Sequence, residues 1–219
     1  MEKIKSTLSN IVLSLTSICL VAGIALSTAN KYTESTIDAS KVLALQHAIR
    51  LVLPDFDNNP VEEQYKLAVT EGDSLTYYPA MLGGKYIGCA VESYTKNGFS
   101  GLIRVMAGFD ANNKLYNYSV LEHSETPGLG SRMETWFREE KNRQNIIGHD
   151  MSKGLLKVIK DGGNVDAITA ATISSRAFLE TINRAYTTFS DDSDAMSGAT
   201  THAAVDIQGY QLRQHKSSK

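Results

Sequence analysis

Apolar and polar positions first separate an N-terminal segment from the rest of the chain. Residues 6–30 carry no charged side chain, and the stretch from Ile11 to Leu26 is almost continuously apolar. About 20 helical residues cross the roughly 30 Å hydrocarbon layer of a bilayer, so the sequence predicts one transmembrane anchor at residues 11–30. Residues 1–10 precede this anchor and include Lys3 and Lys5.

A cleaved signal peptide is the alternative for this segment, because Ser27 and Ala29 are small enough for a peptidase site. The apolar run is longer than the roughly 7 to 15 apolar residues of a usual signal peptide, which favours a retained anchor. Under both interpretations the two lysines keep residues 1–10 in the cytoplasm, and the chain from Lys31 onward is exported.

The exported part changes its periodicity along the chain. Apolar residues at helical spacing predict an amphipathic helix over Thr33–Leu53, which Pro54 stops. Between Leu75 and Glu122 the period shifts toward two, and short turns at Gly83-Gly84, Asn97-Gly98 and Asp110–Asn113 predict an antiparallel meander. Residues 134–144 have charged helical character, and a second amphipathic helix is predicted from Ile173 to Phe189.

This order of elements indicates an α+β fold, an antiparallel sheet flanked by helices and preceded by the anchor. The predicted exported domain covers residues 31–189. Residues 190–219 are rich in Ser, Asp, Thr, His and Lys, which predicts a flexible C-terminal tail.

Composition narrows the classes of function. The chain has 219 residues, of which 42% are hydrophobic and 21% charged, so it can bury a hydrophobic core. Its formal net charge of −2 provides no basic field for phosphate backbones, and nucleic acid is not an expected partner. Cys19 lies in the apolar run and Cys89 in a predicted strand, so no disulfide is expected between them.

The segment from Asp161 to Ala177 carries the candidate chemistry. A loop with two glycines delivers several hydroxyl residues to the start of the second amphipathic helix. The first N–H groups of a helix lack intrahelical partners and the macrodipole is positive there, so an anion such as phosphate is stabilised. Ordinary N-capping by Thr172 or Ser174 explains the same hydroxyls. Composition alone does not decide between these interpretations.

The amino-acid sequences of three segments resemble motifs of one protein family. Asp166-Ala-Ile-Thr-Ala-Ala-Thr172 is similar to the flavinylation signature, Asp-x-x-Ser/Thr-x-Ala-Thr, of the FMN-binding domain. That domain is shared by the G subunit of the Rnf electron-transport complex and the C subunit of the sodium-translocating NADH:quinone reductase. Gly98-Phe-Ser-Gly101 and Glu125-Thr-Pro-Gly-Leu-Gly130 resemble two further segments of the family. The length of the chain favours the Rnf G subunit.

The resemblance implies a cofactor and a set of site residues. In the family, the last threonine of the signature bonds through its hydroxyl oxygen to the phosphate of FMN, and here that residue is Thr172. No metal site is implied. The family's usual glycine is replaced by Ala170, and alanine reaches positive φ less easily. Trp136 is a flavin neighbour or an ordinary core or interface residue. The implied cofactor-binding residues are Thr172, Thr169, Ala171, Asp166, Glu125, Thr126, Gly128 and Leu129.

The predicted tail contains a second copy of the signature. Asp194-Ala-Met-Ser-Gly-Ala-Thr200 matches the pattern with its glycine intact, so Thr200 is a second, less favoured acceptor. Thr172 is favoured because the lead-in before it and the amphipathic helix after it match the family, whereas Thr200 lies in tail-like composition.

As a function, the resemblance implies a covalently flavinylated electron carrier in an ion-translocating ferredoxin:NAD oxidoreductase. Its expected partners are the other membrane subunits of an Rnf-type complex and, for maturation, a flavin transferase. The implied location is the bacterial inner membrane, single-pass, with the main domain on the periplasmic side. The chain has no nucleotide fingerprint and no iron–sulfur spacing, so the expected role is a relay. The alternatives are an exported binding or sensor domain without cofactor, and a flavin donor to another reductase.

Overall fold

One long helix, α1, begins the described part of the protein. The computed structural model describes residues 8–69 and 74–197, and α1 covers Leu8–Val52. The predicted anchor and the predicted amphipathic helix are therefore one continuous element, which ends just before Pro54. Its segment Ser9–Thr28 is long and apolar enough to cross a membrane, which confirms the expected apolar helix. The chain divides within α1 into two units, Met1–Gln46 and His47–Lys219.

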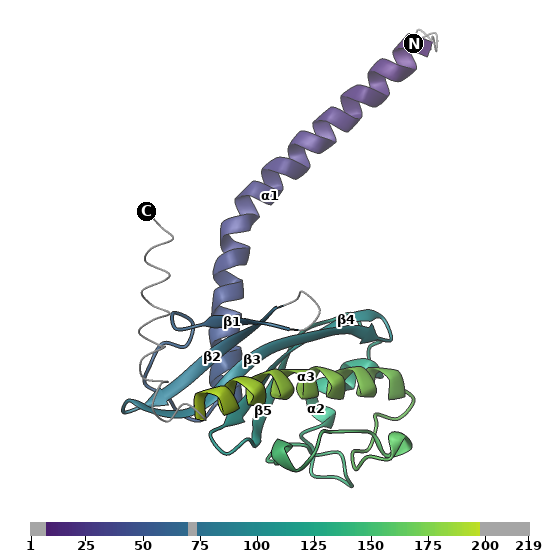
Figure 1. Cartoon of the computed structure of the whole chain (residues 1–219). Coiled ribbons are helices and arrows are strands. Elements are labelled where there is room, and N and C mark those ends of the chain that lie inside the picture. The colour runs from purple at the N-terminus through teal and green to yellow at the C-terminus, as the bar shows by residue number, and fades with distance from the viewer. Residues whose placement is uncertain (1–7, 70–73, 198–219) are drawn as a thin grey trace. The chain divides into compact units, whose positions relative to one another are not determined.

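A five-stranded sheet forms the centre of the second unit (Figure 1). Its strands follow one another in chain order and every neighbouring pair is antiparallel, which confirms the predicted meander. Gly83 and Gly84, which have φ of 58° and 73°, form the tight turn between the second and third strands. The strands are β1 (Tyr65–Ala68), β2 (Ser74–Leu82), β3 (Lys85–Gly98), β4 (Gly101–Asp110) and β5 (Leu115–His123).

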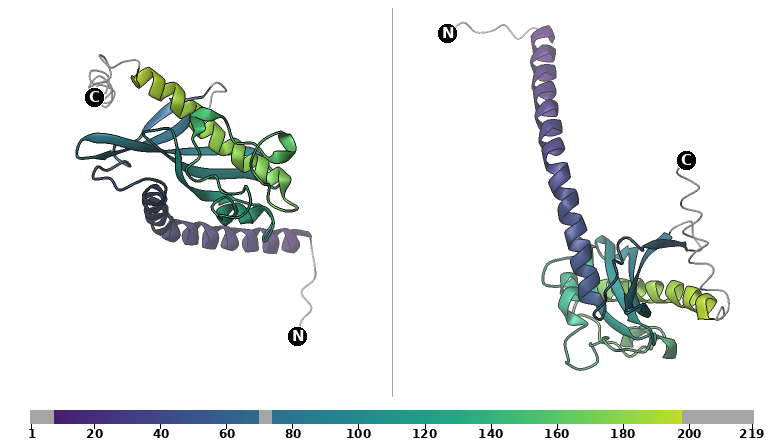
Figure 2. Two further views of the ribbon diagram at one scale, coloured as in Figure 1. Left: turned by 90° about the horizontal axis from the view of Figure 1, so that it is seen from below. Right: turned by 90° about the vertical axis from the view of Figure 1, so that its left-hand side faces the viewer.

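Helix α3, Thr172–Ser197, crosses one face of this sheet (Figures 1 and 2). Alternate residues of β3 and β4, including Val91 and Val105, turn toward the helix and are fully buried. Phe109 of β4 stacks on Phe189 of α3, with ring centroids 5.5 Å apart. The main core therefore lies between the sheet and the apolar side of α3.

The opposite face of the sheet receives the end of α1. Ile49 and Val52 are buried there. Gly108 is next to Phe109 on β4 and so faces the other way. A Cβ atom at Gly108 would overlap the carbonyl oxygen of Val52, so the helix end and the strand meet main chain to main chain. This close approach requires glycine at position 108.

The chain between β5 and α3 is mostly irregular. The predicted charged helix over residues 134–144 is wrong, because α2 covers Met133–Trp136 alone. Phe137 turns into the core, its carbonyl oxygen accepts a hydrogen bond from the Ile146 N–H at 3.0 Å, and Asn142 adopts a positive φ of 54°. The 3-10 turns of this region are η1 (Gly130–Arg132), η2 (Met151–Lys153) and η3 (Ile159–Asp161).

The structure also bears on the end of the second amphipathic helix and on the two cysteines. Helix α3 continues to Ser197, past the predicted end near Phe189, because residues 190–197 contain no glycine or proline to break it. The remainder of the predicted tail, including Thr200, lies outside the described residues. Cys19 is exposed on α1 and Cys89 is buried in β3, and both are free.

Candidate functional site

A tight turn carries the chain from Asp166 to the start of α3. The Ala171 N–H donates to the Ile168 carbonyl oxygen at 3.0 Å. The buried Ser175 hydroxyl accepts the Ile168 N–H and donates to the Ala171 carbonyl oxygen, both at 2.9 Å. Ala170 lies at the tip of the turn in the left-handed region, with φ of 61°. One buried serine of the first helical turn therefore holds the shape of the loop before it.

Ala170 adopts the backbone conformation that glycine reaches without cost. We expect Ala170→Gly to raise the free energy of unfolding by about 0.5–1 kcal/mol. Left-handed alanine costs about 1–2 kcal/mol, and the extra freedom of glycine in the unfolded chain offsets part of the gain. Denaturant unfolding of the two proteins measures the difference.

The matched control is Ala167→Gly in the same loop, where the residue has no positive φ. That variant should be less stable than the parent protein, because glycine only adds disorder to its unfolded state. If both glycine variants lose stability equally, Ala170 is not strained.

Thr172 is the first residue of α3, and its side chain is half-buried. Its hydroxyl has no hydrogen-bond partner within residues 8–69 and 74–197, so it does not cap the helix. Ser174 does not cap it either, because its hydroxyl donates to the Glu125 carboxylate at 2.5 Å. The interpretation of these hydroxyls as ordinary caps is therefore wrong. A free hydroxyl lies where helix N–H groups and the macrodipole favour an anion.

Asp166 and Thr169 lie on the far side of the turn. The Asp166 carboxylate accepts the Arg143 N–H at 2.9 Å, and the Asp166 carbonyl oxygen accepts the Trp136 indole N–H at 2.9 Å. These bonds tie the loop to α2 and to the irregular segment after it. Asp166, Thr169, Trp136 and Arg143 contribute to the lining of a cavity of about 670 Å³. The structure therefore places Trp136 beside the signature segment.

Glu125 is the buried centre of the second predicted segment. Only 4% of its surface is exposed. One carboxylate oxygen accepts the Ser100 N–H at 2.9 Å, and the other accepts the Ser174 hydroxyl. The carboxylate thus joins the turn between β3 and β4, the loop after β5 and the first turn of α3. The predicted Glu125 loop and the Thr172 helix start are brought together through Ser174.

Two glycines allow this close packing around Glu125. An ideal Cβ at Gly130 would lie 2.6 Å from both the Glu125 Oε2 atom and the Ser174 Oγ atom. One at Gly98 would lie 2.7 Å from the Glu125 Oε1 atom. Both distances are below those of real Cβ contacts, so each position requires glycine.

The loop between Glu125 and Gly130 is a compact turn at the surface. The Leu129 N–H donates to the Thr126 carbonyl oxygen at 3.1 Å, and Gly128 has a φ of 74°. Thr126 and Gly128 are exposed, and Leu129 is 40% exposed. The turn therefore presents a short main-chain surface and one large apolar side chain beside the start of α3.

Comparison with known proteins identifies the domain that contains both segments. The sequence profile of the FMN-binding domain matches residues 98–187. The chain is 36% identical over 166 residues to the G subunit of the ion-translocating oxidoreductase complex of Photorhabdus laumondii, an alignment that covers 71% of this chain and 77% of that protein. This chain belongs to the family of these G subunits. The corresponding protein of Yersinia pestis is 30% identical over 164 residues, covering 71% of this chain and 78% of that protein.

A third G subunit, from Shewanella loihica, is 26% identical over 189 residues, which are 82% of this chain and 88% of that protein. The FMN-binding domain of this G-subunit family member spans the Gly98 turn, the Glu125 loop and the start of α3 at Thr172. The family expected from the sequence is confirmed.

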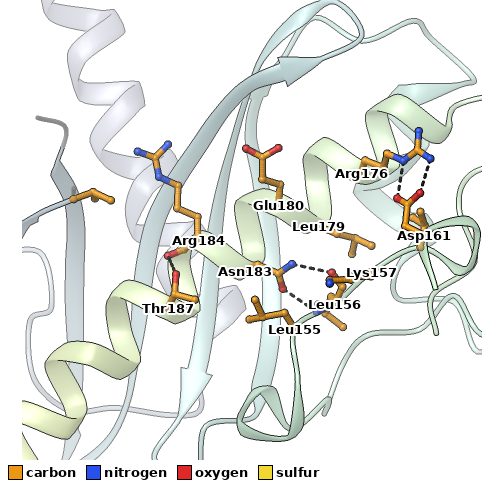
Figure 3. Close-up of a pocket in the computed structure, with 12 residues that line it drawn as sticks. Leu155, Leu156, Lys157, Asp161, Arg176, Leu179, Glu180, Asn183, Arg184 and Thr187 are labelled. Carbon is orange, nitrogen blue, oxygen red and sulfur yellow. Dashed lines mark hydrogen bonds and ion pairs between the residues drawn. The ribbon is translucent and has the colours of Figure 1, made fainter. Parts of the chain in front are cut away.

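In this G-subunit family member, a groove of about 660 Å³ runs along α3 beyond the predicted site residues (Figure 3). Arg176 makes two hydrogen bonds to the Asp161 carboxylate, at 2.6 and 2.7 Å, which hold the pKa of that carboxyl below its usual range. The Asn183 amide accepts the Leu156 N–H and donates to the Leu156 carbonyl oxygen, at 2.9 and 2.8 Å. These contacts hold residues 156–161, which precede the signature segment, against α3 beyond its first turn.

Sequence reasoning missed the contacts that hold the site together. Ser100, Ser174 and Ser175 bond to main chain or to Glu125, and the Arg143 main chain pairs with Asp166. The adjacent serines after Thr172 were a signal, because polar residues on the apolar side of a predicted helix need partners when they are buried. The role of Ser100 comes from its main chain, which leaves no trace in the sequence.

Proposed function

We propose that this chain is a covalently flavinylated electron-carrier subunit of an Rnf-type ion-translocating oxidoreductase complex, with FMN joined to Thr172. Three observations support the proposal: the family, the FMN-binding domain that contains Thr172, and the free hydroxyl at the start of α3. Within the first turn of α3, the free hydroxyl carries the choice of Thr172, because the Ser174 and Ser175 hydroxyls are both bonded and buried.

The residues around Thr172 fit the parts of FMN. The start of α3 offers main-chain N–H groups and a positive dipole end to the phosphate. The Glu125 loop, kept close by Gly130, offers exposed main chain and the Leu129 side chain to the ring system. Bound FMN would supply the electron chemistry of the subunit, and the chain supplies its position and electrostatic environment.

Attachment requires a phosphoester bond between the Thr172 hydroxyl oxygen and the phosphorus of the flavin nucleotide. The bond that breaks joins phosphorus to the leaving group of an activated flavin nucleotide, and the hydroxyl proton departs with that group. No side chain within residues 8–69 and 74–197 is hydrogen-bonded to the Thr172 hydroxyl, so this part of the chain offers it no base. A separate flavin transferase would supply the catalysis.

The names of the relatives suggest where this chain acts as an electron carrier. The relatives are named as subunits of ion-translocating oxidoreductase complexes, so we infer that this chain passes electrons between other membrane subunits of such a complex. Helix α1 would anchor it in the bacterial inner membrane with residues 1–10 in the cytoplasm, because Lys3 and Lys5 precede the apolar segment. The FMN-binding domain then lies on the periplasmic side. Without exchange with a cytoplasmic flavin pool, a covalent bond prevents loss of the cofactor.

Peptide mass spectrometry of the full-length protein, produced together with a flavin transferase, tests the proposal. We expect the mass of one FMN, less one water, on the peptide that contains Thr172. FMN found solely on the peptide that contains Thr200 would contradict the assignment. Colourless protein without any added mass would favour the alternative of a binding or sensor domain without cofactor.

A further inference from the structure

Three large apolar side chains are exposed on the segments that meet at the Glu125 carboxylate. Phe99 is 67% exposed, Leu129 is 40% exposed and Ile173 is 50% exposed. Each belongs to a different segment: the turn between β3 and β4, the loop after β5, and the start of α3. Exposed apolar residues that gather from separate segments indicate a binding surface more than scattered single ones do.

The contacts of Glu125 explain why these three segments lie together. Phe99 precedes Ser100, Leu129 precedes Gly130, and Ile173 precedes Ser174. Ser100 and Ser174 both donate hydrogen bonds to the Glu125 carboxylate. Gly130 is packed against the same carboxylate. Each exposed apolar residue is therefore the immediate chain neighbour of a residue that contacts Glu125. We call Phe99, Leu129 and Ile173 together the apolar surface.

Glu125 itself is poorly placed to bind a ligand directly. It is 4% exposed, and both of its carboxylate oxygens accept hydrogen bonds from within the protein. Its main-chain N–H donates to the Nδ1 atom of His123 at 3.1 Å. A buried carboxylate bonded in this way fixes the geometry of the segments that it joins, and removal of either donor leaves a buried acceptor unsatisfied.

We propose that Glu125 is a positioning residue, and that Phe99 and Ile173 complete with Leu129 an apolar surface that holds the flavin ring carried by Thr172. The inference rests on the proposed function. Ile173 is the chain neighbour of Thr172. The ribityl phosphate that would join the ring to the Thr172 hydroxyl therefore begins beside the apolar surface. Burying the dimethylbenzene edge of the ring against it removes apolar area from water on both sides.

Single replacements in the apolar surface test the contact with the ring. We expect Phe99→Ala and Ile173→Ala to keep the FMN stoichiometry found by intact mass. The visible circular dichroism of the flavin should be lost in large part, its emission anisotropy should fall, and quenching by iodide should rise, because the ring turns more freely and meets more solvent. The matched control is Leu155→Ala in the groove along α3, where a leucine is 44% exposed. It should leave all three signals as in the parent protein.

If Phe99→Ala and Ile173→Ala carry FMN and give the same three signals as Leu155→Ala, the apolar surface does not hold the ring, and this inference is overturned while the proposed function stands. Absence of FMN from Thr172 in the parent protein overturns both. The two failures are therefore distinguished by the mass measurement.

Variants at Glu125 separate positioning from direct contact. Glu125→Gln retains an acceptor for the Ser100 N–H, and its amide can donate to the Ser174 hydroxyl, so the optical signals and the flavin reduction potential should stay near those of the parent protein. Glu125→Leu removes both contacts and should lose the signals. Ser174→Ala removes one contact, and we expect a partial loss in a protein that folds. A large shift of potential in Glu125→Gln with unchanged circular dichroism would show instead that the charge acts on the flavin directly.

Discussion

A Thr172→Ala variant is expected to carry no covalently bound FMN. The variant removes the hydroxyl proposed to form the phosphoester, and the other hydroxyls of the first turn of α3, those of Ser174 and Ser175, stay in hydrogen bonds. Alanine is a good helix former, and the Thr172 hydroxyl caps nothing in the described structure, so the fold should not suffer. Intact mass and the yellow fluorescence of the denatured protein measure the loss.

Thr172→Ser is the matched control, because it keeps a hydroxyl at the same position. We expect it to retain FMN in part or in full when it is produced with the same transferase. An alanine variant that carries the parent amount of FMN would place the bond elsewhere, with Thr200 in the second copy of the signature as the first residue to examine.

Phe178→Ala is expected to lower the free energy of unfolding by about 3–5 kcal/mol, the usual range for a buried phenylalanine truncated to alanine. The Phe178 ring stacks on Phe137 with centroids 4.7 Å apart and meets the edge of Tyr118 at 4.8 Å. All three rings are fully buried, so truncation leaves a cavity between α3, β5 and the segment after α2. Denaturant unfolding at constant temperature measures the change.

Phe99→Ala provides the comparison for Phe178→Ala. The same chemical change at a side chain that is 67% exposed should alter stability by no more than about 0.5 kcal/mol. Similar losses in both variants would mean that the Phe178 ring is not part of a tightly packed core. The pair also shows that the optical effects expected of Phe99→Ala do not come from unfolding.

Much of the fold could be predicted because its strands are long and regular. The alternation through Cys89–Val91 and Ile103–Phe109, broken by glycine and asparagine turns, is sufficient to predict β3 and β4 in a meander. Strand β1 was missed because it has four residues at the edge of the sheet, too few for a periodic pattern to appear. The charged composition of residues 134–144 led to the prediction of a helix there, but the helix ends at Trp136, Phe137 is buried and Asn142 has a positive φ.

In the candidate site, contiguous motifs could be predicted from the sequence, whereas contacts between distant residues could not. The segment from Asp166 to Thr172 and the Glu125 loop were visible because each is a contiguous run of residues that resembles the family. The bond between Ser174 and Glu125 joins residues 49 positions apart, and the role of Ser100 depends on its main chain. Contacts of that kind follow from tertiary folding, which one sequence does not reveal.

The close approach of Val52 to Gly108 determines how far the chain can be trimmed. Residues 47–53, which include the end of α1, cover the second face of the sheet, where Tyr78, Ala90 and Met106 are buried. A shortened protein that starts after Leu53 would expose that apolar patch to water and invite aggregation. Any anchor-free version of the domain for crystallisation or electrochemistry should therefore begin at or before His47.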